Sequence, residues 1–149
     1  MTDQVIKTFG IYSFDLIENH RTVYGDDFTS RLPRHPNTKI MVPERLDNLL
    51  KKALNIYENE PENQFRIYMF AIEGIKSAQL YFGDKLSIHK SYVIKAYRER
   101  MPNFPMKQFG LEIWQNYIET RYPHNVKPHK PISEYIDFLK QIRNLVCKP

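Results

Sequence analysis

Apolar residues recur at helical spacing along most of the chain, and prolines separate one periodic segment from the next. The segment at about 62–82 is apolar on nearly all sides, apart from a narrow strip that holds Arg66, Glu73 and Ser77. A helix of this kind is buried on most of its surface, so we expect it at the centre of the fold. The helix before it carries one apolar stripe, formed by Leu46, Leu49, Leu50, Ala53, Leu54 and Tyr57.

Prolines predict where these helices begin and end. We expect Pro43 in the first turn of its helix, where the missing N–H has no intrahelical partner to lose. Further helices are expected at about 87–101 and 106–121, and a last one begins at Pro131. Three prolines between 122 and 131 exclude a continuous helix there. The fold class is therefore all-α: one compact domain over 1–149, with five or six helices around the helix at about 62–82.

The N-terminal part is less regular. Residues 3–19 have helical spacing, but Gly10 and its apolar neighbours also suit a short strand. We favour the helix and keep the strand as the alternative. Residues from about 20 to 41 show no period, and Pro33 and Pro36 fix an extended path, which predicts an irregular loop. Loops of this length are often functional or disordered.

The distribution of charge adds a functional clue. Residues 1–84 carry 10 Lys/Arg and 12 Asp/Glu, whereas residues 85–149 carry 12 Lys/Arg and 5 Asp/Glu. The formal net charge of +5 thus comes from the C-terminal part. Such asymmetry favours a polyanionic partner or an acidic protein surface, and a solvated basic surface explains it equally well.

Cysteine content and apolar runs bear on where the protein acts. Cys147 is the single cysteine, so an intramolecular disulfide is excluded and a reducing compartment is favoured. The first residues do not resemble a signal peptide, and no run approaches the roughly 18 apolar residues that a membrane span requires. We expect a cytoplasmic protein that does not bind a membrane.

No recognisable catalytic or metal-binding motif appears. His124 and His129 are close in sequence but lack the further Cys or His ligands of a structural zinc site. The five glycines do not cluster into a phosphate-binding loop, and Cys147 lies at a terminus where a shaped pocket is not expected. We expect neither cofactor nor metal, and a non-enzymatic protein is favoured. An enzyme whose catalytic residues converge from distant positions is a third alternative.

Two binding functions follow from these patterns. The first is a protein-binding module such as an inhibitor, an immunity or antitoxin-like protein, or a small subunit, because Tyr and Arg are abundant. The alternative is nucleic-acid binding through 85–130, if the helix at about 87–101 and the 121–130 loop are neighbours. Tyr92, Tyr97 and Tyr122 would then stack on bases or face the core. The candidate contact residues for either partner are Lys95, Arg98, Arg100, Arg121, Lys127 and Lys130.

Overall fold

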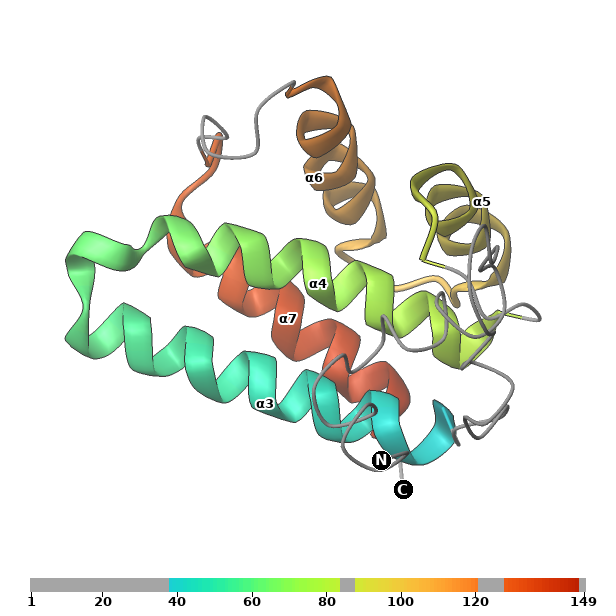
Figure 1. The fold of residues 1–149 in the computed structure, drawn as a ribbon, viewed down its shortest axis with the longest axis horizontal. Helices are drawn as coiled ribbons and strands as arrows, with labels where there is room; N and C mark the ends of the chain where they lie inside the picture. Colours follow the sequence, from blue (N-terminus) through green and yellow to red (C-terminus); the bar gives the residue numbers. More distant parts are fainter. Residues whose placement is uncertain (1–37, 84–87, 121–127, 148–149) are drawn as a thin grey trace, which may run out of the picture.

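Figure 1 shows the computed structural model, which describes residues 38–83, 88–120 and 128–147. These residues form helices and no strand, which confirms the all-α class for the described part of the chain. The predicted helix or strand at 3–19 and most of the predicted 20–41 loop lie outside the described residues. The elements are α3 (Thr38–Asn59), the short 3-10 helix η2 (Pro61–Asn63), α4 (Phe65–Phe82), α5 (Lys90–Arg100), α6 (Lys107–Glu119) and α7 (Ile132–Val146).

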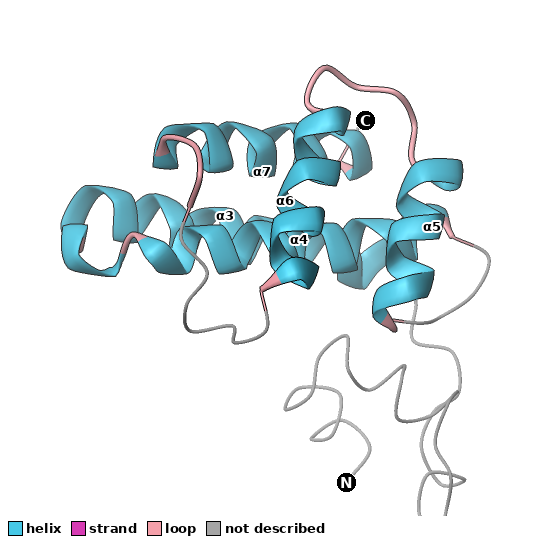
Figure 2. Ribbon diagram, turned by 90° about the horizontal axis from the view of Figure 1, so that it is seen from above, coloured by secondary structure: helices cyan, strands magenta, loops and turns pink. Residues whose placement is uncertain are grey.

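Three long helices form the body of the fold. α3 and α4 make a helical hairpin through η2, and α7 packs against both of them. α3 runs opposite in direction to α4 and α7, and α5 and α6 cross over α4 (Figures 1 and 2). One hydrophobic cluster includes residues from all five helices. None of the described helices is both long enough and apolar enough to cross a membrane.

α4 supplies the largest share of buried residues. Ile67, Ala71, Ile75 and Ala78 have no exposed surface, and the helix contacts α3, α5, α6 and α7. Part of its polar strip is buried as well, because Ser77 has no exposed surface. The Ser77 hydroxyl donates a hydrogen bond of 2.8 Å to the carbonyl oxygen of Glu73, which satisfies this polar group inside the core.

The start of α3 corrects two predictions. The helix begins at Thr38, so Pro43 lies inside it, and residues 38–41 are helical instead of belonging to the loop. Pro43 cannot donate the backbone hydrogen bond to the carbonyl of Lys39. Two features tie this first part of α3 to the rest of the fold: Val42 is fully buried, and Lys39 Nζ donates a hydrogen bond of 2.8 Å to the carbonyl oxygen of Tyr81.

Other helix ends and stripes also differ from prediction. α4 begins at Phe65 because Pro61–Asn63 form a separate 3-10 turn. α5 and α6 are shorter than predicted, at Lys90–Arg100 and Lys107–Glu119. On α3, Tyr57 is 43% exposed, and Ile56, only 3% exposed, faces the core in its place. On α7, Phe138 is a fully buried core residue.

The connection between α5 and α6 is fixed by side-chain caps. Lys107 Nζ donates hydrogen bonds to the carbonyl oxygens of Arg98 at 3.2 Å and Met101 at 2.8 Å. These carbonyls lie at the C-terminal end of α5, where the helix itself supplies no donors. The Tyr97 hydroxyl donates to the carbonyl oxygen of Lys107 at 3.1 Å. Lys107 therefore connects the end of α5 to the start of α6.

Candidate functional site

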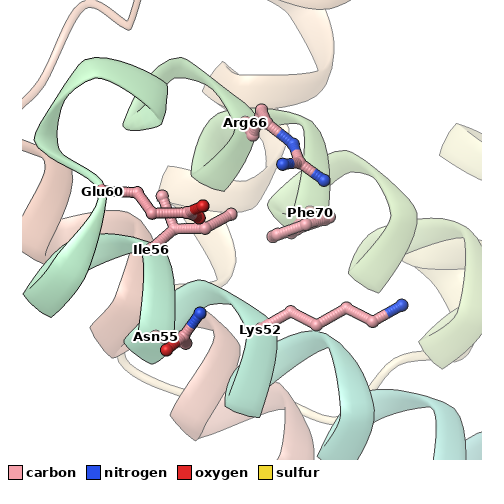
Figure 3. Close-up of a pocket in the computed structure, with 6 residues that line it drawn as sticks. All are labelled: Lys52, Asn55, Ile56, Glu60, Arg66 and Phe70. Atoms are coloured by element: carbon pink, nitrogen blue, oxygen red, sulfur yellow. The ribbon is translucent and has the colours of Figure 1, made fainter.

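A groove lies between the C-terminal half of α3 and the first turns of α4 (Figure 3). Its volume is about 260 Å³. Ile56 and Phe70 give it an apolar lining, and Ile56 also belongs to the core. The residues that line the groove are Lys52, Asn55, Ile56, Glu60, Arg66 and Phe70.

Charged side chains surround the apolar part of this groove. The Arg66 guanidinium lies 5.8 Å from the centroid of the Phe70 ring, at the distance of a cation–π contact. In Figure 3, Lys52 and Arg66 extend on either side of Phe70, while Glu60 lies toward the η2 turn. None of these three charged side chains forms an ion pair within the described residues. The groove therefore has a basic end at Phe70 and an acidic end at the turn.

Backbone hydrogen bonds of the turn hold the groove residues in place. The Glu60 N–H donates to the carbonyl oxygen of Ile56 at 2.9 Å and ends α3. The Asn63 N–H donates to the carbonyl oxygen of Glu60 at 2.9 Å and closes η2, while the Ile67 N–H donates to Gln64 at 3.0 Å. Because the turn is this short, Glu60 in the connection and Arg66 on α4 line the same groove.

Two exposed aromatic rings lie at the same end of the α3–α4 hairpin. Phe65 is 56% exposed at the first position of α4, and Tyr57 is 43% exposed in the last turn of α3. Interfaces are enriched in aromatic residues and Arg. We call Tyr57, Phe65 and the groove residues together the hairpin-end surface. It offers aromatic, cationic and anionic groups for recognition.

The predicted site residues occupy two separate places. Lys95, Arg98 and Arg100 are exposed on α5, and Lys130 is exposed just before α7. In both Figures 1 and 2, α6 stands between α5 and the segment that leads into α7. The segment just before α7, which includes Lys130, is thus separated from α5. Arg121 and Lys127 lie outside the described residues, so the full patch stays a prediction.

Burial decides the role of one tyrosine in this region. Tyr97 has no exposed surface and faces the core, so its ring is not available to stack on a base. Burial also raises the pKa of its hydroxyl. Tyr92 is half-buried, and Tyr122 lies outside the described residues. Lys107, a further basic residue of the region, is engaged with the end of α5.

The described residues do not suggest a metal centre. In 38–83, 88–120 and 128–147, no three His, Cys, Asp or Glu side chains gather closely enough to hold an ion. His129 lies next to Tyr135. The Tyr135 hydroxyl is 3.3 Å from the His129 Nδ1, and it accepts a hydrogen bond of 3.2 Å from the backbone N–H of His129. Cys147 is a half-buried residue directly after α7.

No known protein family, curated protein or solved structure matches the chain. Sequence patterns missed the hairpin-end surface because its residues carry no motif. Two signals were present: Phe65 and Arg66 directly follow a charged turn, and Lys52 and Asn55 lie off the apolar stripe of their helix.

Proposed function

We propose that this chain is a non-enzymatic, cytoplasmic protein-binding module that contacts its partner through the hairpin-end surface. Such a module would serve as an inhibitor, an immunity or antitoxin-like protein, or a small subunit of a larger assembly. The observation that carries the proposal is that Phe65 and Tyr57 are exposed at the end of the α3–α4 hairpin, whose groove holds Arg66 and Lys52 without an ion pair among the described residues. The single cysteine fits a reducing compartment.

The physical reason for this choice is what a partner would cover. Burying an exposed ring such as Phe65 against a partner favours binding by roughly 25 cal/mol per Å² of apolar surface that leaves water. Hot spots of protein interfaces are enriched in Tyr, Trp and Arg, and they lie near the centre of a contact that excludes water. Arg66 and Tyr57 are residues of these types, and the groove that Arg66 lines gives a partner side chain a place to insert.

Nucleic-acid binding through α5 is the second candidate. The observation that favours it is the group of exposed cations Lys95, Arg98 and Arg100 on one short helix. Phosphate contacts of this kind would make the affinity fall steeply with salt. The burial of Tyr97 removes one of the three aromatic rings available to this candidate.

The experiment is an affinity pull-down from the native host, analysed by mass spectrometry, with and without nuclease and at low and high salt. The bait is the full chain, either unchanged or carrying Tyr57→Ser and Phe65→Ser. A matched control bait carries Lys95→Glu and Arg98→Glu. We expect one stoichiometric protein whose binding survives nuclease and high salt. It should bind the control bait as well, and it should not bind the Tyr57/Phe65 variant. Nucleic acid that elutes with salt and is lost from the control bait would support the second candidate instead.

A further inference from the structure

We propose that the groove binds an acidic peptide segment of the partner protein, with a carboxylate paired with Arg66, a second positive charge from Lys52 on the other side of Phe70, and an apolar side chain against the Phe70 ring. This inference rests on the proposed function and adds the chemistry of the ligand. It concerns only the six lining residues and their charges.

The size of the groove favours a peptide side chain. Pockets for cofactors and other small molecules enclose about 300–1,000 Å³. The groove, at about 260 Å³, is smaller and is lined by residues from α3, α4 and the connection between them. A ligand of one or two side chains matches this volume.

The charges at the Phe70 end favour a carboxylate. Lys52 and Arg66 lie on either side of this ring, and neither has an ion-pair partner among the described residues. A planar guanidinium that already stacks near an aromatic ring presents its N–H groups in the geometry that a carboxylate accepts. An Asp or Glu side chain that enters here would lie near the positive charges of Arg66 and Lys52 and near the apolar ring of Phe70.

Glu60 distinguishes a peptide from a nucleic acid. It places a carboxylate at the turn end of the groove, within the same set of lining residues as the two cations. A polyanion with phosphates at regular spacing would be repelled there, because like charges at close range oppose binding. A peptide avoids this repulsion when it is acidic only at the Phe70 end and neutral or basic at the Glu60 end.

The test is selection of random-sequence peptides from a display library on the full chain. We expect enriched peptides to share an acidic residue next to an apolar one, and Arg66→Glu to weaken their binding roughly tenfold or more. Selection on a Lys52→Glu, Arg66→Glu chain should lose the acidic preference. Lys95→Glu, a charge reversal outside the groove, should leave binding unchanged, and Arg66→Gln provides a milder second variant if Arg66→Glu unfolds.

Opposite results would overturn the inference. They are the absence of enriched peptides, enriched peptides without an acidic residue, or acidic peptides whose affinity depends on Lys95 and not on Arg66. The proposed function fails separately. If binding of the pull-down partner depends on Phe65 and Tyr57 while peptide selection shows no acidic preference, the proposal of a protein-binding module is retained. Only the proposed acidic peptide ligand is then wrong. If the pull-down yields nucleic acid alone, the proposed function fails too.

Discussion

Tyr97 and Gly110 approach so closely that no side chain fits between them. A Cβ atom added at Gly110 would overlap the Tyr97 hydroxyl and lie 2.8 Å from Cε2 of Phe138. The same hydroxyl donates a hydrogen bond to the carbonyl oxygen of Lys107, in the first turn of α6. The absence of a side chain at Gly110 thus allows α6 to pack directly on α5 and α7.

Gly110→Ala should therefore destabilise the protein. In an ordinary helix interior this change stabilises by about 0.5–1 kcal/mol, because glycine loses more backbone entropy on folding. Here the overlap with Tyr97 and Phe138 should lower the free energy of unfolding by about 1–3 kcal/mol, measured by urea denaturation. The exposed Gln108→Ala in the same helix is the control. A smaller loss in a Tyr97→Phe background would identify the hydroxyl as the clash, whereas a more stable Gly110→Ala protein would contradict this packing.

Lys107→Met should lower stability although the residue is a lysine in the basic part of the chain. The variant leaves the Arg98 and Met101 carbonyl oxygens without their donor, at an expected cost of about 1–2 kcal/mol in thermal or urea unfolding. Lys95→Met on the exposed face of α5 should change stability by less than about 0.5 kcal/mol. Equal effects of the two substitutions would show that Lys107 does not cap α5.

Stability should fall in alkaline solution. Burial raises the pKa of Tyr68 to about 12, and it raises the pKa of Tyr97 and of Tyr135 as well. Each folded-state pKa exceeds the unfolded value of about 10, so the folded protein binds more protons above that pH. The stabilisation that these protonated hydroxyls contribute to the folded state is complete below pH 10. It declines as the pH rises toward 12, by at most about 1.4 kcal/mol per pH unit for each tyrosine. Urea denaturation at a series of pH values measures this slope.

Tyr97→Phe tests the assignment of this slope. It removes one buried hydroxyl that must stay protonated in the folded state, so the decline above pH 10 should become shallower. Tyr57→Phe, at an exposed position, is the control and should keep the slope of the unchanged protein. A slope that is identical in both variants would assign the alkaline loss to other groups.

Exposed and buried aromatic residues should respond differently to truncation. Phe65→Ala removes a ring that is 56% exposed, so the free energy of unfolding should change by less than about 1 kcal/mol. Phe138→Ala removes a fully buried ring and should cost about 3–5 kcal/mol. Chemical denaturation measures both. A large loss from Phe65→Ala would assign this ring to stability instead of binding.

Hydrophobic periodicity predicted the helical class because period and burial coincide over long segments. It failed where contacts distant in sequence decide the outcome. Pro43 indicates a helix start when only its neighbours in sequence are considered, yet α3 begins at Thr38. Lys39, in this additional first part, bonds to the carbonyl oxygen of Tyr81, which is 42 residues away in sequence. Periodicity also cannot distinguish Tyr57 from Ile56, which are adjacent on α3 but differ in exposure, at 43% and 3%.

The candidate site was harder to predict than the fold. The basic residues of 85–130 predicted a binding region because charge can be read directly from the sequence. The groove, in contrast, depends on how α3 and α4 are joined. Glu60 and Arg66 look like ordinary solvated charges until the η2 turn brings them to one groove. Lys107 and Tyr97 show the reverse case, since a charged and an aromatic residue of the basic region serve the packing of α5 and α6.

The most direct measurement is hydrogen–deuterium exchange of the full chain with and without its captured partner. We expect slower exchange in the segment from Lys52 to Phe70, which contains the hairpin-end surface, and unchanged exchange in α5. Slower exchange confined to α5, around Lys95 and Arg98, would contradict the central claim and assign binding to the basic helix.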